Sequence, residues 1–272
     1  MSTVPTHLEV DLNYTLKTGE RPVSYTFTPP EGVPQRSGKV DRQRVRVRNA
    51  RLEDELPALD RNGFQLIRHA TALQDFSDEA AIRERYYPEV QKLLQEHTGA
   101  SKVVVFDHTL RNADKGHGQE GVREPVPYVH NDQTFVSGPR RVRDHLSPDE
   151  AAQRLGKRHA IINVWRPIAA PVQNWPLALC DARSIEPDDL IPSDLVYRDK
   201  VGETYAFRAN PSHRWFYYPE LQVNEVVLLK IYDSKTDGTA RLTAHTAFED
   251  PSSPAGAPPR RSIEVRTLVF WD

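Results

Sequence analysis

The sequence predicts a mainly β protein with flanking helices, of the antiparallel sandwich or jelly-roll class. Short runs of β-branched and aromatic residues fill its second half, separated by loops rich in Pro, Gly, Asp and Ser. Those loops lack the regular helices of a parallel βαβ array. The 22 prolines and a hydrophobic share of 38% also favour many short elements over a long-helix protein.

The strands are expected where these apolar runs lie, and the last four follow one another closely. Their residue ranges are 102–108, 159–169, 195–199, 215–219, 224–233, 241–248 and 262–271. A helix is predicted over residues 77–99, with Ser77 as its cap and Pro88 interrupting it. A shorter helix is predicted over residues 147–156, capped by Ser147. Both helices are expected to pack against the sheet.

The chain divides into an arm and one domain. Residues 1–48 are rich in Pro, Gly and polar residues, which indicates an extended amino-terminal arm. Within it, Arg and Val alternate over residues 42–48, as expected for a strand with one solvent-facing side. Residues 49–272 are then a jelly-roll domain with helical support.

Charge and cysteine content exclude several classes of protein. The chain of 272 residues has 36 Lys and Arg against 38 Asp and Glu, so it has no basic excess for nucleic acid. The single cysteine, Cys180, excludes an internal disulfide and a multi-thiolate metal site. No run approaches the roughly 20 apolar residues of a membrane span, and the first residues do not resemble a secretory signal. We therefore expect a cytoplasmic protein that binds neither nucleic acid nor membrane.

The segment PYVHNDQTF contains the most informative pattern, because His130 and Asp132 are separated by one residue. On a strand this spacing points both side chains to one face, where an imidazole nitrogen and a carboxylate oxygen can reach one metal ion. A second histidine would complete the two-histidine, one-carboxylate face that holds ferrous iron. His245 follows a buried strand and is favoured; His213, among aromatic residues before that strand, is the rival and fits a substrate pocket better.

The last strand carries polar residues on one face. Alternation places Arg260, Ser262, Glu264 and Arg266 together, and such a face either meets solvent or turns into a cavity. Inside a cavity, an Arg fork beside a Ser hydroxyl would bind a dicarboxylate bidentately. We expect the cavity arrangement.

Eight segments, taken in order, make the sequence recognisable. They are FDHTLR, VHNDQT, NVWRPI with PLALCDARS, HRWFYYPE, LKIYDS, HTAFEDP and PRRSIEVRTLVFW. From about Phe64 to its end the chain resembles the CmcJ/AsaB-like family, also called the gibberellin-desaturase or hydroxylase/desaturase family. That family is similar to the Fe(II)- and 2-oxoglutarate-dependent oxygenases built on a double-stranded β-helix, the cupin-like jelly roll.

The resemblance implies roles for particular residues. His130, Asp132 and His245 would be the catalytic iron ligands, and an Arg of the last strand would bind 2-oxoglutarate. Arg260 with Ser262 fits the usual Arg-x-Ser pattern, whereas Arg266 competes. The remaining candidates come from the segments NVWRPI and HRWFYYPE: Asn163 and Trp165 for the co-substrate, and Arg166, His213, Tyr217 and Tyr218 for the substrate.

The predicted activity is oxidation of an unactivated C–H bond in a small secondary metabolite or amino acid. Fe(II), 2-oxoglutarate and O2 would be required, and succinate and CO2 released. Hydroxylation, desaturation and oxidative cyclisation all remain open. Two alternatives use the same residues differently: a cupin-like metal-dependent hydrolase or isomerase, and a non-catalytic β-sandwich binding protein in which His130 and Asp132 are only a surface pair.

Overall fold

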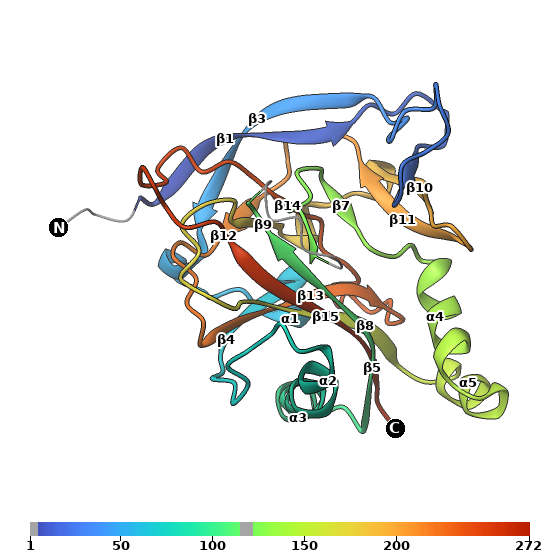
Figure 1. Ribbon diagram of the computed structural model, residues 1–272. Coiled ribbons are helices and arrows are strands. Elements are labelled where there is room, and N and C mark those ends of the chain that lie inside the picture. The colour runs from blue at the N-terminus through green and yellow to red at the C-terminus, as the bar shows by residue number, and fades with distance from the viewer. Residues whose placement is uncertain (1–4, 115–121) are drawn as a thin grey trace.

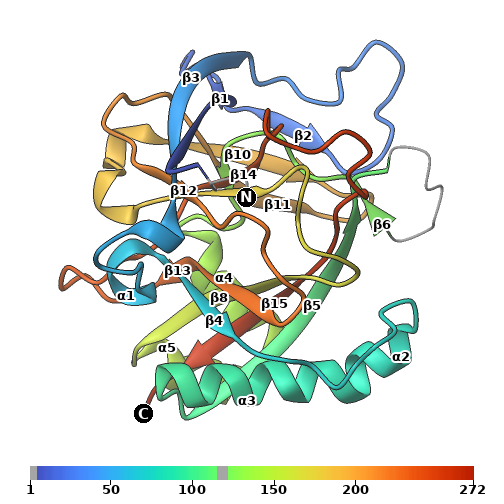
Figure 2. The ribbon, with the colours of Figure 1, turned by 90° about the vertical axis from the view of Figure 1, so that its left-hand side faces the viewer.

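The computed structural model describes residues 5–114 and 122–272, and most of its elements are strands (Figure 1). Within these residues the strands form a sheet of nine and a sheet of six. The nine-stranded sheet curls over the inner face of the six-stranded sheet, and helices cover the outer face of the latter (Figures 1 and 2). This arrangement confirms the predicted mainly β jelly roll with flanking helices.

The nine-stranded sheet holds strands from distant parts of the chain. They are β1 (His7–Thr15), β2 (Val23–Tyr25), β3 (Val40–Asn49), β7 (His130–Asn131), β9 (Leu177–Cys180), β10 (Leu190–Val196), β11 (Val201–Phe207), β12 (Trp215–Tyr217) and β14 (His245–Ala247). Their order is β1-β3-β12-β9-β14-β7-β11-β10-β2, antiparallel except where β3 meets β12 and β2 meets β10. The two-residue strand β7 therefore lies between β14 and β11.

The six-stranded sheet contains the longest apolar strands. They are β4 (Phe64–Arg68), β5 (Lys102–Asn112), β6 (Val122–Arg123), β8 (His159–Pro167), β13 (Glu225–Asp233) and β15 (Arg261–Phe270), in the order β4-β13-β8-β15-β5-β6. Ile263 and Val265 of β15 belong to the core beneath the helices, whereas Ser262 and Glu264 alternate with them and are also buried. The polar face of this strand thus turns into the molecule, as predicted, rather than to solvent.

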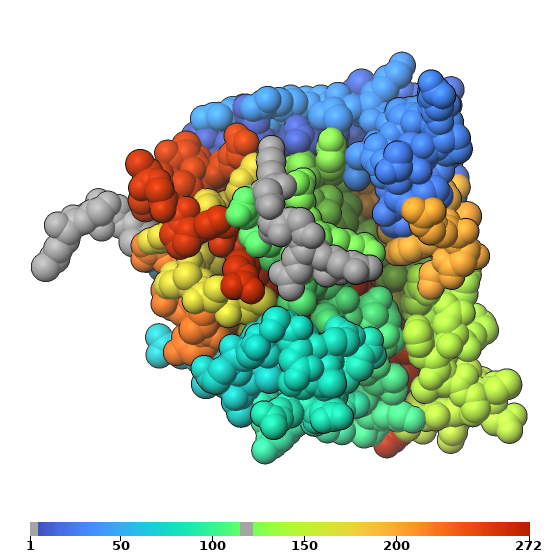
Figure 3. Space-filling model, viewed as in Figure 1, coloured from blue at the N-terminus to red at the C-terminus, as the bar shows by residue number. Residues whose placement is uncertain are grey.

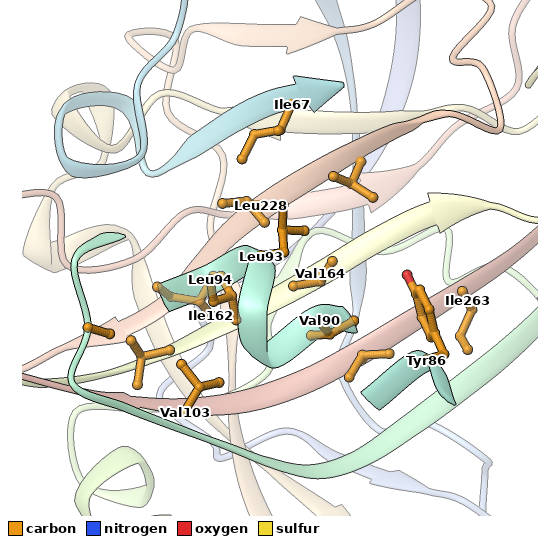
Figure 4. Packing of buried hydrophobic residues seen from close by; sticks show 14 of the residues in the cluster. Ile67, Tyr86, Val90, Leu93, Leu94, Val103, Ile162, Val164, Leu228 and Ile263 are labelled. Atoms are coloured by element: carbon orange, nitrogen blue, oxygen red, sulfur yellow. The ribbon is translucent and has the colours of Figure 1, made fainter. Parts of the chain in front are cut away.

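Helix α3 (Tyr87–Thr98) lies along the outer face of the smaller sheet (Figure 2). Its buried residues Leu93 and Leu94 pack against strand residues such as Ile162, Val164 and Leu228 (Figure 4). Burial of these side chains gives this face an apolar core, which stabilises the fold by removing hydrocarbon from water.

The start of this helical segment differs from the prediction. Asp78, not Ser77, caps α2 (Glu79–Ala81): its carboxylate accepts hydrogen bonds from the backbone N–H groups of residues 80 and 81. The Ser77 N–H itself donates to the Asp75 carboxylate, so Ser77 belongs to the preceding turn. The predicted interruption is present, but as a π-helical turn (Ile82–Tyr86) before α3, whose first turn accommodates Pro88.

The other helices are short. Ser147 caps α5 (Pro148–Leu155), which confirms the second predicted helix, and α4 (Ser137–His145) precedes it. Helix α4 was not predicted, because it starts without a side-chain cap and has a mostly polar, arginine-rich sequence. The remaining turns are α1 (Leu59–Asn62) and three 3-10 turns, Ala50–Leu52, Ala182–Ser184 and Pro187–Asp189. Among the described helices none is long and apolar enough to span a membrane.

Strands β1 and β3 form an antiparallel ribbon across the top of the molecule, shown in blue in Figure 3. Val10, Leu12 and Tyr14 point inward and join a core cluster that includes Trp215 of β12. The arginines of β3 lie on the outer side, where they pair with Asp11 and other acidic residues of the ribbon. They therefore form the predicted solvent-facing side of a strand.

Candidate active site

Strand register brings the predicted metal ligands together. His130 of β7 lies directly opposite His245 of β14 in an antiparallel pair, and the two ring centroids are 4.3 Å apart. Asp132 follows β7 by one residue, and its Oδ1 lies 3.6 Å from His130 Nε2. One ligand atom from each of the three side chains lies within 4.8 Å of the other two. The structure thus assembles the predicted set from segments more than a hundred residues apart.

The short strand β7 is fixed by its neighbours. Asn131 points away from the cluster, and its buried amide donates to the carbonyl oxygens of Gln133 and Ile231. These two bonds shape the turn after the strand. Asp132 is consequently on the same side as His130, as the spacing of one residue predicted.

The histidines present nitrogen lone pairs to the cluster. His130 Nδ1 lies 2.7 Å from the Tyr128 carbonyl oxygen, so Nδ1 donates a hydrogen bond there and Nε2 is left as the electron-pair donor. Burial, assisted by the neighbouring His245, lowers the pKa of His130 to about 4. Burial also lowers the pKa of His245. Both rings are therefore neutral at pH 7, as metal ligands must be.

The carboxylate of Asp132 is held through its second oxygen. Burial alone would raise its pKa, but the Arg266 guanidinium and the Asn163 amide hold that pKa well below its usual range. Oδ2 accepts from Asn163 Nδ2 at 2.8 Å and from Arg266 Nε at 3.2 Å. Because Oδ2 has these two donors, Oδ1 is the oxygen directed at His130 and available to a metal.

Arg266 has a different environment from the one predicted for a co-substrate residue. Besides Asp132, its guanidinium contacts Asp107 at 2.9 Å and Glu264 at 3.7 Å, and it donates to Thr109 Oγ1. Asn163 donates to both Asp132 and Glu264. Arg266 and Asn163 are thus neighbours of the metal-ligand carboxylate.

Arg260 is buried and has no carboxylate within ion-pair distance in the described chain. Its Nη1 donates to the Trp175 carbonyl oxygen, its Nε has no hydrogen-bond partner, and its guanidinium lies 5.4 Å from the Trp165 ring centroid. Burial, with the nearby Arg111, lowers the pKa of Arg260 to about 9. The hydroxyl of Ser262 is also buried without a partner. Such polar groups are suited to an anionic ligand.

Arg111 of β5 is a further residue of this site, and sequence reasoning missed it. It lies opposite Ser262 in the β5–β15 register and donates to the Glu124 carbonyl oxygen. Burial lowers the pKa of Arg111. The only available signal was its place at the end of an apolar strand, because the sequence does not reveal that this strand pairs with β15.

These groups surround one small cavity, of about 20 Å³. Its lining residues come from six strands and from the loops that hold Val126 and Arg260. They are Arg111, Val126, His130, Trp165, Leu177, His245, Ala247, Arg260 and Glu264. The cavity thus has both histidines of the ligand set and two guanidinium groups in its wall, with Glu264 as its one carboxylate. A metal ion bound by the two histidines would therefore lie next to two guanidinium groups.

The four residues expected to contact substrate do not line this cavity. Arg166 points to the opposite face of β8 and contacts His69. His213 lies 3.0 Å from both Tyr14 and Asp189, so the rival third ligand is engaged elsewhere. Tyr217 and Tyr218 are buried in two separate apolar clusters.

The donor set fits a divalent transition metal. Two neutral imidazoles and one carboxylate held by one oxygen are the ligands of the facial arrangement that binds Fe(II) and leaves three positions open. Among the described residues, the buried Nδ1 atom of His245 has no hydrogen-bond partner. On this jelly roll, the set defines the class of non-haem iron oxygenases.

Comparison with known proteins identifies the group within this class. The family model "Oxidoreductase/YMDC permease-like domain" matches residues 12–270. The chain is 38% identical over 258 residues to the hydroxylase/desaturase efuI of Hormonema carpetanum, covering 86% of this chain and 85% of that one. It is 34% identical over 253 residues to the Fe(II)/2-oxoglutarate-dependent dioxygenase nvfI of Aspergillus novofumigatus, covering 90% of each.

A solved structure, the iron and alpha-ketoglutarate-dependent endoperoxidase NvfI, superimposes with a TM-score of 0.89 at 31% identity and covers 98% of this chain and 99% of that one. The chain therefore belongs to the hydroxylase/desaturase family of Fe(II)- and 2-oxoglutarate-dependent oxygenases. This confirms the resemblance read from the sequence and makes the protein an enzyme, an oxidoreductase.

Proposed function

We propose that this oxygenase oxidises an unactivated C–H bond of a small secondary metabolite or amino acid, with His130, Asp132 and His245 as its iron ligands. The observation that carries the proposal is the convergence of these three side chains beside Arg111 and the buried Arg260, whose Nε has no hydrogen-bond partner among the described residues. The alternative, a cupin-like hydrolase or isomerase with the same ligands, is disfavoured because the relative nvfI and the similar solved structure are named as Fe(II)- and 2-oxoglutarate-dependent enzymes. A non-catalytic binding protein would not require neutral, inward-facing histidines.

Fe(II) bound here, together with O2 and 2-oxoglutarate, would supply the oxidising power for hydrogen removal, and 2-oxoglutarate would leave as succinate and CO2. Arg260 and Ser262 would bind a carboxylate of 2-oxoglutarate, because Arg260 Nε and Ser262 Oγ are buried and have no hydrogen-bond partner among the described residues. Arg111 supplies a second positive charge to the same cavity. Asn163 and Arg266 hold Asp132 with one oxygen directed at the metal.

Trp165 and Leu177 give the cavity apolar walls that exclude water around the reacting groups. The substrate C–H bond must then be positioned beside this small space, and its placement decides between hydroxylation, desaturation and ring formation.

The test is metal and co-substrate binding by the purified protein. We expect one Fe(II) per chain, and a visible charge-transfer band when 2-oxoglutarate is added without oxygen. His245→Ala should lose the iron, whereas His213→Gln, the matched change at the rival histidine, should keep it. Retention of iron by a folded His245→Ala variant would contradict the ligand assignment, and zinc- or manganese-dependent turnover without 2-oxoglutarate would favour the hydrolase or isomerase.

A further inference from the structure

The loop before β9 has an unusual backbone. Trp175 has a φ of 45°, in the left-handed region that bulky side chains rarely adopt. It also precedes Pro176, and a residue before proline is normally restricted to extended conformations. Such strain persists only where surrounding contacts enforce it, and it is common at functional sites.

The contacts of this turn converge on Arg260. The Trp175 carbonyl oxygen accepts a hydrogen bond from Arg260 Nη1, and Asn174 Oδ1 accepts one from the Arg260 backbone N–H at 2.9 Å. The turn therefore holds both the backbone and the guanidinium of Arg260, a residue that lines the small cavity. Two further bonds, from Asn174 Nδ2 to Ala257 and from Ser253 to Gln173, attach the turn to the proline-rich loop before β15.

Trp175 also lines a second cavity, apart from the contact that its carbonyl oxygen makes with Arg260. This larger cavity has a volume of about 430 Å³, and its wall contains apolar residues such as Ala247 and Phe248 and charged residues such as Asp11 and Arg42. Ala247 lines the small cavity too, so the two cavities share part of a wall. The indole is half-buried there, whereas the carbonyl oxygen of the same residue contacts Arg260.

We propose that Trp175 is a positioning residue for the co-substrate: its strained, left-handed backbone directs the carbonyl oxygen at Arg260 and so orients Arg260 to bind 2-oxoglutarate. This inference rests on the proposed function, since it assumes that Arg260 binds the co-substrate. It assigns to Trp175 no contact with iron or with 2-oxoglutarate.

Two substitutions separate the backbone from the side chain. Trp175→Ala and Trp175→Gly both remove the indole, but only glycine adopts a positive φ without strain. We expect the alanine variant to relax to a negative φ, which turns the carbonyl away from Arg260. The glycine variant can keep the turn. Asn174→Ala and Asn174→Asp form a second pair, which leaves the indole in place. Alanine removes the oxygen that accepts from the Arg260 backbone N–H, whereas aspartate retains such an oxygen.

The measurement is the Kd of 2-oxoglutarate for the Fe(II)-loaded protein, determined by anaerobic calorimetry, with the iron affinity measured in parallel. We expect Trp175→Ala to bind 2-oxoglutarate about fivefold more weakly than Trp175→Gly, with equal iron affinities. Asn174→Ala should also bind more weakly, and Asn174→Asp should restore binding. Equal Kd values for the alanine and glycine variants, or for the two Asn174 variants, would overturn the inference.

Arg260→Ala distinguishes a failure of this inference from a failure of the proposed function. If that variant binds 2-oxoglutarate as the wild type does, the co-substrate assignment is wrong and the inference falls with it. If Arg260→Ala loses 2-oxoglutarate binding, but the two Trp175 variants have equal Kd values and the two Asn174 variants do too, only the role of the turn is refuted.

Discussion

Arg260 directly precedes β15 and Arg266 lies within it, and we predict that replacing them by alanine has different consequences. Arg260 uses Nη1 for the Trp175 carbonyl, and Nε has no partner among the described residues, so we expect Nε and Nη2 to bind a carboxylate as a fork. Two hydrogen bonds to a charged group contribute about 1.5 kcal/mol each at the low end. Their loss, about 3 kcal/mol, corresponds to a roughly 100-fold weaker binding of 2-oxoglutarate.

The effect on stability should be small for Arg260→Ala. The pKa of Arg260 is lowered to about 9 because burial disfavours its charged form, so removal of the guanidinium also removes a buried charge. We expect a change in the free energy of unfolding of no more than about 1 kcal/mol, the contribution of one hydrogen bond. Iron affinity should remain that of the wild type.

Arg266→Ala should show the opposite pattern. Removal of the Arg266 guanidinium leaves three carboxylates, those of Asp132, Asp107 and Glu264, without their shared cation. We expect weaker iron binding and a lower unfolding temperature, with the loss of 2-oxoglutarate binding following from the loss of iron. Anaerobic titrations of each variant with Fe(II) and then 2-oxoglutarate make the comparison. Weak iron binding by Arg260→Ala, or a pure 2-oxoglutarate defect in Arg266→Ala, would refute the reasoning.

Three further predictions concern other parts of the molecule. Asn163→Ala should weaken iron binding by about 10- to 100-fold, because Asn163 is a hydrogen-bond partner of Asp132; an unchanged iron titration would contradict this. Leu94→Ala should lower the free energy of unfolding by about 2–5 kcal/mol in urea melts, since the Leu94 side chain of α3 is fully buried against the sheet. Burial lowers the pKa of His213 below its usual 6.5. As the pH falls from 7 to 5, His213 therefore binds a proton more readily in the unfolded chain than in the folded one, and the metal-free protein should lose stability. His213→Gln should make that loss smaller, and an identical pH slope in urea melts would count against the assignment.

Local sequence patterns predicted the parts of the site that lie close together in the chain. The spacing of His130 and Asp132 and the alternation along β15 each depend on a few consecutive residues, and both are present as predicted. His245 was favoured from the order of segments alone. Its position directly opposite His130 depends on register, which is set by contacts between distant strands.

The features that were missed depend on pairing or on competition between neighbours. Arg111 belongs to the site because β5 pairs with β15, and no local pattern specifies that partner. The cap at Asp78 rather than Ser77 results from a competing hydrogen bond to Asp75. The positive φ of Trp175 could not be predicted, because tertiary contacts override its residue preference.

The amino-terminal ribbon has a practical consequence for anyone who shortens this polypeptide. Composition makes its residues look dispensable, yet Leu12 and Tyr14 complete an apolar cluster, and β3 covers one side of β12. A chain trimmed to begin at residue 49 would expose hydrocarbon and an unprotected strand edge to other molecules. Such a fragment should precipitate on overproduction, even though every proposed iron ligand is still encoded in it.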